Sequence, residues 1–446
     1  MKRKSKWFKL TPPRVFAGGF ALIIAVGTLL LSLPAAAVSG EATPWVDALF
    51  TATSATCVTG LLVVDTGTYF TKFGQVVILI LVQLGGLGFM TTVTWFAIAM
   101  KKRISLRDRL MLKESMNLLG IEGVVRLIMK VLIYSVVIES FAALYFAYRL
   151  SQEMPLGHAL YYGVFHAISL FNNAGFELFG GFRNLTPYVA DWGINLVSML
   201  LILFGGIGFI VLSELVDYPS SRRLSLHSKV VLTATGILTL LSALLIFIFE
   251  YTNARTLGPL SLDTKILASL FQAITLRSAG VNTIDITGLR SATQFLMVIM
   301  MFIGAAPGST GGGIKLTTFV ILVGAVLTMV RGKQDMVLFR YRVPKRDIYK
   351  ATTFSLLGLF CLVLSTMALS TVQGQDFLMI LFEAASAFGT VGLSAGLTPE
   401  LGFAGKINII VMMYIGRVGL ITLAFALQPK LKKDSYRYPE GKLTIG

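Results

Sequence analysis

Four short segments of this 446-residue chain each end in a glycine that follows small or polar residues: TCVTG (56–60), NNAG (172–175), RSAG (277–280) and GTVG (389–392). Glycine permits backbone conformations that other residues avoid, so such a segment can turn its carbonyl oxygens to one side. Rings of carbonyls can replace the hydration shell of a monovalent cation. The segments contain no Asp or Glu before their glycines, which disfavours tight binding of a divalent ion. The pattern therefore predicts a site for a large, easily dehydrated monovalent cation.

The composition indicates where such a site lies. Hydrophobic residues make up 55% of the chain and charged residues only 14%, whereas soluble domains carry about a quarter charged residues. Apolar runs long enough to cross a bilayer predict eight spans, near 15–37, 76–100, 127–149, 193–216, 230–250, 295–330 (interrupted), 351–371 and 407–427. The first run is longer than the apolar part of a signal peptide, so we expect a retained span.

Shorter apolar pieces lie between these spans, at 45–57, 159–171, 266–276 and 377–389. They are too short to span and too apolar for ordinary loops, which favours re-entrant half-helices. In three copies a Phe precedes the closing glycine by ten residues, and the third copy is one residue shorter. A second glycine cluster follows each copy, at 85–88, 205–208, 304–308 and 416–419; close helix packing is the alternative interpretation of these second clusters.

The sequence thus predicts an all-α polytopic membrane protein with four membrane–pore-helix–membrane repeats around a pseudo-fourfold central pore. The expected units are repeat 1 (1–100), repeat 2 (101–217), repeat 3 with an intramembrane loop (218–335), repeat 4 (336–430) and a cytoplasmic tail (431–446).

Basic residues indicate the orientation. Five segments, 1–14, 101–130, 218–229, 331–350 and 426–446, hold 29 of the 39 Lys and Arg residues. By the positive-inside rule these segments face the cytoplasm, with both termini, and the half-helices enter from outside. The net charge of +17 therefore reports orientation, and we expect no nucleic-acid partner.

The stretch IGAAPGSTGGGIKLTT (303–318) interrupts the sixth span. A nucleotide-binding P-loop needs Gly-Lys-Ser/Thr between a strand and a helix, but here Leu316 follows Lys315 and no strand is expected before it. Irregular backbone at membrane depth must be buried in protein or line a watery cavity. We therefore expect a mobile gate beside the cation site. The predicted gate residues are Gly308, Gly311, Gly312, Gly313, Lys315 and Arg417.

Charged residues within the apolar segments need partners. We expect Arg417 to donate to carbonyls of the loop and to place positive charge in the ion path; a purely structural pairing is the alternative. Lys315 either joins this site or extends to the cytoplasmic interface. Glu383 is expected to be satisfied by hydrogen bonds, and Arg277 to point away from the axis and brace the third segment. Glu139 and Glu250, near span ends, are expected at the interfaces.

Enzymatic chemistry finds little support in the sequence. The two cysteines lie in different segments, and the three histidines, His158, His166 and His227, form no cluster with a nucleophile or a metal ligand. We expect neither an enzyme nor a covalent cofactor.

The four closing segments, the four predicted repeats and the glycine-rich loop resemble the Trk/Ktr/HKT superfamily of K⁺ transporters over residues 14–430, and the chain is most similar to the bacterial Ktr-type membrane (pore) subunit. The resemblance implies K⁺ uptake across the plasma membrane through a filter with one glycine per repeat. The implied filter residues, with K⁺ as the only metal ion, are Val58, Thr59, Gly60, Asn173, Ala174, Gly175, Ser278, Ala279, Gly280, Thr390, Val391 and Gly392.

The resemblance also implies partners. They are a second copy in a homodimer, to which the C-terminal tail contributes, and a cytosolic nucleotide-binding ring of the RCK type. ATP or ADP is then expected on the partner and not on this chain. Membrane lipid is the alternative partner of the basic segments, and a Na⁺-conducting or weakly selective transporter is the alternative function.

Overall fold

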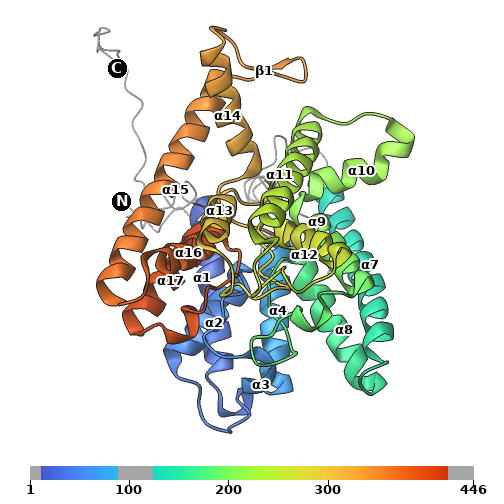
Figure 1. Cartoon of the computed structure of the whole chain (residues 1–446), viewed down its shortest axis with the longest axis vertical. Coiled ribbons are helices and arrows are strands. Elements are labelled where there is room, and N and C mark those ends of the chain that lie inside the picture. The colour runs from blue at the N-terminus through green and yellow to red at the C-terminus, as the bar shows by residue number, and fades with distance from the viewer. Residues whose placement is uncertain (1–11, 89–123, 420–446) are drawn as a thin grey trace, which may run out of the picture.

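The computed structural model describes residues 12–88 and 124–419, and the regular secondary structure of this part is helical except for one short hairpin (Figure 1). The helices of residues 12–88 are α1 (Pro12–Leu31), α2 (Trp45–Cys57), α3 (Thr66–Tyr69) and α4 (Lys72–Leu87). Those of the second unit are α7 (Val124–Leu150), α8 (Leu156–Phe171), α9 (Trp192–Gly206) and α10 (Phe209–Ser221). Those of the third are α11 (Leu226–Glu250), α12 (Leu262–Thr275), α13 (Ser291–Phe302) and α14 (Leu316–Val330).

The two-stranded antiparallel hairpin β1 (Val337–Leu338) and β2 (Tyr341–Arg342) follows α14. The last unit comprises α15 (Lys345–Val372), α16 (Phe377–Gly389) and α17 (Phe403–Val418). Three single-turn 3₁₀ helices, at Pro34–Ala36, Thr186–Tyr188 and Thr398–Glu400, lie in the connections. The half-helices predicted at 45–57 and 377–389 coincide with α2 and α16, and those at 159–171 and 266–276 correspond to the slightly longer or shifted α8 and α12.

Side chains at several helix starts explain where the helices begin. Asp191 accepts a hydrogen bond from the backbone N–H of Ile194 (2.9 Å) and caps α9. Ser225 accepts from the backbone N–H of Ser228 (3.2 Å) and caps α11. Each bond satisfies a backbone donor that the first helical turn leaves free.

Four described helices are long and apolar enough to cross a membrane: α1, α7, α11 and α15. The predicted span 193–216 is not continuous, because it breaks between α9 and α10 with a bend of 106°. The break falls at Gly208, whose φ is +91°, and its backbone lies against the loop after α13, since the Phe209 N–H donates to the Gly308 carbonyl (2.9 Å). Counted as one span, this bent pair would be a fifth candidate.

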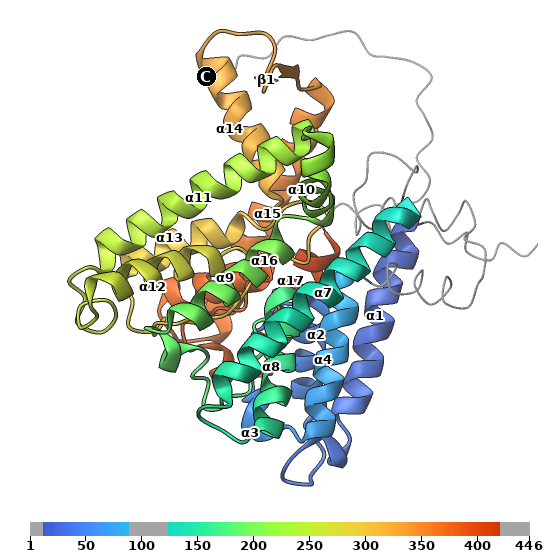
Figure 2. The ribbon, with the colours of Figure 1, turned by 90° about the vertical axis from the view of Figure 1, so that its right-hand side faces the viewer.

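The helices pack in a closed cycle. Each half-helix contacts the long helix that precedes it, in the pairs α1–α2, α7–α8, α11–α12 and α15–α16. The next helix of each unit also contacts the half-helix of the following unit, in the pairs α4–α8, α9–α12, α13–α16 and α17–α2. The last pair joins the fourth unit to the first, and the ion pair between Lys406 of α17 and Asp47 of α2 (2.5 Å) reinforces it. The contacts therefore run from each unit to the next and close on themselves; Figure 2 shows the half-helix α8 beside the long helix α7 that precedes it.

The half-helix α2 and the long helices differ in how much of their side chains is buried. The residues of α2 from Phe50 to Cys57 are all buried, whereas the long helices expose large apolar side chains such as Leu29 (70%), Phe141 (73%) and Leu240 (68%). A helix that exposes such side chains over its length needs an apolar solvent. This surface is the one expected of a protein that lies in lipid.

Some predictions concern residues outside the described ranges. The residues outside these ranges include 89–100 of the span 76–100 and 420–427 of the span 407–427. They also include most of the basic segments 1–14 and 101–130, and the tail 431–446. The helices that enter the two spans, α4 and α17, end next to Gly88 and Gly419, whose φ values are +85° and +86°.

Candidate functional site

The four closing glycines form a ring at the centre of the helix cycle. Their φ values are all positive: +91° at Gly60, +72° at Gly175, +70° at Gly280 and +92° at Gly392. This region of backbone space favours glycine over residues with a side chain. The residue two positions before each glycine is also left-handed, with φ of 57° at Val58, 60° at Asn173, 74° at Ser278 and 47° at Thr390. A left-handed Val or Thr is a genuine outlier, of the kind that marks functional sites.

The close approach of the glycines shows that the ring is closed. A Cβ added to Gly60 would lie 2.5 Å from the Ala174 carbonyl oxygen and 3.0 Å from the Gly175 Cα. One added to Gly175 would lie 3.2 Å from the Gly280 Cα. A Cβ added to Gly280 would lie 3.1 Å from the Gly392 Cα, and one added to Gly392 would lie 3.0 Å from the Gly60 Cα. Each unit therefore contacts the next in chain order and the fourth contacts the first, with no room for a side chain at any of the four positions.

The third segment shares the backbone pattern of the others. Although it is one residue shorter between its Phe and its glycine, Ser278 and Gly280 have the same pair of positive φ values as the corresponding residues elsewhere. The missing residue lies before the ring. Thr275, five residues before Gly280, accepts a hydrogen bond from the Val281 N–H (3.1 Å) and donates one to the Val281 carbonyl (2.5 Å). Ser278 thus has the same left-handed backbone as Val58, Asn173 and Thr390 in the other units.

Hydrogen bonds from the half-helices hold the ring backbone. Ser54 of α2 accepts from the Gly60 N–H, and Ser386 of α16 accepts from the Gly392 N–H, both at 3.0 Å. Ser169 of α8 donates to the Phe176 carbonyl (2.7 Å). In all four units a hydroxyl near the end of the half-helix therefore fixes the backbone at or just after the glycine.

The carbonyl oxygens before the glycines remain unpaired. Within residues 12–88 and 124–419, none of eight such oxygens accepts a hydrogen bond, namely those of Val58, Thr59, Asn173, Ala174, Ser278, Ala279, Thr390 and Val391. Buried backbone carbonyls nearly always have a partner. A concentration of unpaired ones around a ring is what a cation that replaces those partners requires.

Buried polar side chains support the segments that follow the ring. Glu383 of α16, with no exposed surface, accepts from the backbone of Ala395 (3.0 Å) and Leu397 (3.3 Å) and from the hydroxyls of Ser394 and Thr398. His166, at the equivalent position of α8, accepts from the Leu178 N–H through Nε2 (3.3 Å). Glu383 is thus satisfied by hydrogen bonds as expected, and His166 holds backbone.

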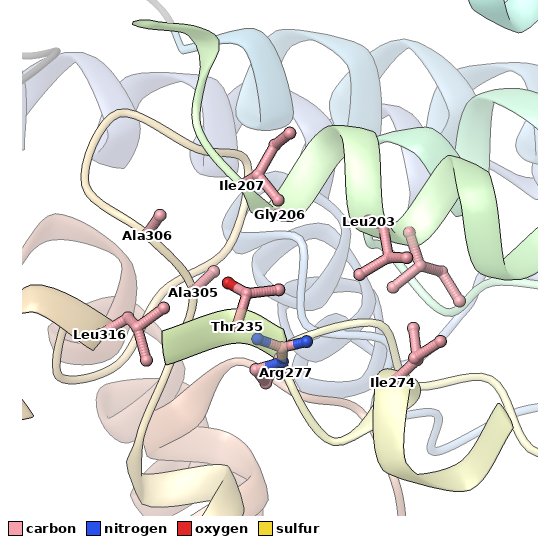
Figure 3. Close-up of a pocket in the computed structure, with 10 residues that line it drawn as sticks. Leu203, Gly206, Ile207, Thr235, Ile274, Arg277, Ala305, Ala306 and Leu316 are labelled. Atoms are coloured by element: carbon pink, nitrogen blue, oxygen red, sulfur yellow. The ribbon is translucent and has the colours of Figure 1, made fainter. Parts of the chain in front are cut away.

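Arg277 lies behind the ring, as the sequence indicated. Its guanidinium donates to the hydroxyl of Thr239 on α11, and its side chain lines a small pocket together with Thr235 and the loop residues Ala305 and Ala306 (Figure 3). The charge therefore sits between α11, α12 and the loop and contributes to their packing.

The loop between α13 and α14, residues 303–315, lies directly against the ring. The Asn173 amide donates through Nδ2 to the Thr310 hydroxyl (2.8 Å), and the Gly312 N–H donates to the Thr390 hydroxyl (2.9 Å). A Cβ on Gly311 would lie 2.8 Å from the Cβ of Ser278. The loop thus contacts the residue two before the glycine in three of the four units.

The rest of the loop is bonded to α9 and α17. The N–H groups of Ala306 and Thr310 donate to the carbonyls of Gly206 (3.1 Å) and Gly205 (3.2 Å), and the Gly313 N–H donates to the Gly416 carbonyl (3.3 Å). No strand precedes the loop. The structural context that a nucleotide-binding P-loop needs is absent from this described segment.

Both cations predicted near the loop lie beside it. Arg417 donates to the Thr310 carbonyl and, with its other terminal nitrogen, to the carbonyls of Gly85 and Gly86 (3.2 Å to the latter). The Lys315 ammonium donates to the Gly311 carbonyl (2.6 Å). Of the two alternatives for Lys315, the loop contact is the one found.

The second glycine clusters serve close packing in three units. A side chain at Gly85, Gly205 or Gly416 would collide with the last carbonyls of the neighbouring half-helix, at Thr56, Phe171 and Phe388 respectively. In the third unit the equivalent Gly304 instead packs against Gly312 of the loop. This outcome matches the helix-packing interpretation.

Two carboxylates that were expected at the interfaces are buried within the protein. Glu139 is 8% exposed and accepts from Gln83 and Asn172, next to the second ring segment. Glu250 is fully buried and accepts from Asn253, Thr256, Thr293 and the Arg290 N–H. Glu139 lies in the middle of α7 and Glu250 is the last residue of α11. Other segments cover both, which hydropathy along the chain does not reveal. Among the described residues, no group of His, Cys, Asp and Glu could hold a metal ion.

The chain is similar to known proteins over almost its whole length. The profile of the TrkH family, described as cation transport protein, matches residues 6–437. The chain is 45% identical to the Ktr system potassium uptake protein B of Bacillus subtilis, over 99% of this chain and 98% of that protein. It is 38% identical to the potassium/sodium uptake protein NtpJ of Enterococcus hirae, over 98% of each chain.

A solved structure supports the same grouping at the level of the fold. The potassium transporter TrkH of Vibrio parahaemolyticus superposes with a TM-score of 0.75, at 18% identity, over 96% of this chain and 87% of that one. This family consists of ion transporters and not of enzymes. Together, the matched profile and the full-length relatives establish that the chain belongs to the TrkH family of cation transport proteins.

Proposed function

We propose that this protein takes up K⁺ across the cell membrane through the glycine ring. The observation that carries the proposal is the ring itself, with four glycines in contact and eight unpaired carbonyl oxygens before them. Carbonyl oxygens of this number and kind suit a weakly hydrated monovalent cation. The ends of four half-helices also direct their negative dipole ends toward the ring, which favours a cation there.

The relatives support K⁺ as the transported ion. One at 45% identity is named for potassium uptake, and another at 38% is named for potassium and sodium uptake. The second name keeps a Na⁺-conducting or weakly selective transporter as the alternative function. The two differ only in how the ring discriminates between ions.

The proposed architecture has four membrane–pore-helix–membrane units, 1–100, 101–217, 218–335 and 336–430, followed by a cytoplasmic tail. In this proposal eight spans cross the plasma membrane, both termini are cytoplasmic, and K⁺ binds only at the ring. The cyclic contacts of the four half-helices with their flanking helices support this arrangement.

The loop at 303–315 is proposed as the gate. It lies against the ring residues Asn173, Ser278 and Thr390, and two cations, Lys315 and Arg417, bind its carbonyls. A cation that leaves the ring on this side would meet both positive charges and the loop backbone, so the loop must move for conduction.

Regulation is proposed to come from a cytosolic nucleotide-binding ring of the RCK type that carries ATP or ADP, on a homodimer of this chain. The relative named as part of a Ktr system supports a multi-component transporter. The hairpin β1–β2 and its flanks project from the helices (Figure 1) and expose Arg331, Lys333, Arg340, Lys345, Arg346 and Lys350. We propose this surface as the docking site for the ring; anionic lipid is the alternative partner.

The test is K⁺ uptake in cells that lack their own K⁺ uptake systems, with a cytosolic ring supplied. Growth on low K⁺ that depends on this chain supports the proposal. Uptake of Na⁺ that K⁺ does not inhibit favours the alternative. No uptake of either ion by a protein that reaches the membrane in folded form would overturn both.

A further inference from the structure

Two ring residues form hydrogen bonds to the loop through their side chains. Asn173 and Thr390 lie in the second and fourth segments, and each points its side chain at the loop. The first segment has an apolar residue, Val58, at the equivalent position. In the third, Ser278 donates its hydroxyl to the Gly389 carbonyl (2.9 Å) and only lies beside Gly311. The side-chain bonds to the loop therefore come from two of the four units.

Neither contact serves the ring itself. The Asn173 Oδ1 atom is buried and has no hydrogen-bond partner in the described part of the chain, so the bond to Thr310 is the one that its amide makes. Thr310 in turn donates its hydroxyl to the Gly205 carbonyl (3.1 Å). The Thr390 hydroxyl accepts from the Gly312 N–H, a loop backbone group. Both side chains are fully buried and held in left-handed backbone.

We infer that Asn173 and Thr390 are positioning residues that latch the loop against the ring. The inference rests on the proposed function, since it assigns these two bonds to the non-conducting position of the proposed gate. When the loop leaves, both bonds must break, and the buried amide and hydroxyl lose their partners. The same two residues contribute carbonyls to the ring, so a displacement of the loop also frees two ring residues from a constraint on their side chains.

Each bond has an isosteric test. Thr390→Val removes the hydroxyl and keeps the shape, and Val58 shows that a valine occupies the equivalent left-handed position in the first segment (φ 57°). Thr310→Val removes the acceptor of the Asn173 bond from the loop side, together with the bond that Thr310 donates to Gly205, and leaves the ring sequence unchanged. Thr371→Val is the matched control, because its hydroxyl is exposed at the end of α15 and bonds only the Ala368 carbonyl of its own helix.

The measurement is Rb⁺ tracer uptake into liposomes that contain the purified protein and no cytosolic ring. Thr390→Val removes one hydrogen bond from the closed state and raises basal flux about fivefold. Thr310→Val removes two and raises it at least as much, and the double variant exceeds either single variant if the bonds act independently. Thr371→Val retains the parent flux.

The outcomes separate this inference from the proposed function. If the parent carries K⁺ in cells but both isosteric variants keep its basal flux in liposomes, the latch is refuted and the transporter stands. If Thr390→Val lowers flux because it disturbs the ring, the result for Thr310→Val decides. A rise in basal flux in that variant supports the latch, and an unchanged or lower basal flux overturns it. If the parent carries neither ion in cells, the proposed function itself fails.

Discussion

Arg417, near the end of α17, donates to the backbone carbonyl of Thr310 in the loop after α13. Its second terminal nitrogen reaches Gly85 and Gly86 of α4. One guanidinium thus joins the fourth, third and first units at the place where the loop covers the ring. Five planar donors make arginine suited to binding several carbonyls at once. The loop position therefore depends on one side chain that is distant in sequence.

Replacement of this side chain should release the loop. Arg417→Ala is expected to raise K⁺ flux roughly tenfold or more, because charge-assisted hydrogen bonds to the loop are lost together with a positive charge in the ion path. Arg417→Lys should have a smaller effect, since it keeps the charge but not the several donors. Tracer flux into liposomes measures both, with the exposed Arg255→Ala as control. Unchanged flux, or lost flux with poor folding, would indicate a purely structural role.

Gly60→Ser tests the ring. A Cβ there would lie 2.5 Å from the Ala174 carbonyl oxygen, in backbone with φ +91°, so the ring must distort. We expect K⁺ uptake to be abolished or to shift towards Na⁺, as measured by competition between the two ions in cells. Gly40→Ser is the matched control, because Gly40 has a similar φ of +72° but nothing within 4 Å of an added Cβ. If Gly60→Ser transports like the parent, Gly60 does not line the filter.

The periodic features of this protein could be predicted from sequence, and the contacts between units could not. The half-helices at 45–57 and 377–389 followed from their length and hydropathy, and the ring residues followed from a glycine at a repeated distance. The third copy is one residue shorter, yet Ser278 has the same left-handed backbone as its counterparts.

Two features that the sequence did not reveal, the break in a predicted span and the burial of Glu139, depend on other segments. The span 193–216 breaks because the loop 303–315 packs against Gly205 and Gly208, a contact about 100 residues away in the chain. Glu139 is buried because Asn172 and Gln83 meet it there. The contacts of Asn173 and Thr390 with the loop are of the same kind. Periodicity reports which face of an element is apolar but not which element covers it.

Glu383→Gln should lower stability. The carboxylate accepts four hydrogen bonds from the segment 394–398 with no exposed surface, and an amide would direct N–H groups at N–H and O–H donors. A buried donor left without an acceptor costs about 1–3 kcal/mol. We expect a lower melting temperature in detergent, whereas the exposed Glu400→Gln should match the parent. Equal melting temperatures for all three proteins would show that Glu383 does not brace this segment.

The exposed basic surface around the hairpin should decide affinity for the cytosolic ring. The double charge reversal Arg340→Glu/Lys345→Glu is expected to weaken binding of the purified ring by at least tenfold, and the parent's affinity should fall with added salt because exposed charges are screened. Arg222→Glu changes a basic residue that is also exposed but lies outside the hairpin, so it serves as control. Binding that neither reversal nor salt weakens would place the docking surface elsewhere.

Gly312→Ala should displace the loop by steric contact alone. An added Cβ would lie 2.7 Å from the Thr390 Cγ2 atom and 3.0 Å from the Gly416 carbonyl oxygen, and both neighbours are fixed in the core, so the loop must yield. We expect higher basal flux without the ring partner, and Gly374→Ala, where an added Cβ meets nothing within 4 Å, should match the parent. Because this change adds an atom and the Thr390→Val change removes a bond, agreement between them would identify loop displacement as the shared cause. A fall in flux with intact folding would mean that the loop, pressed against Thr390, closes the path more firmly and does not leave it.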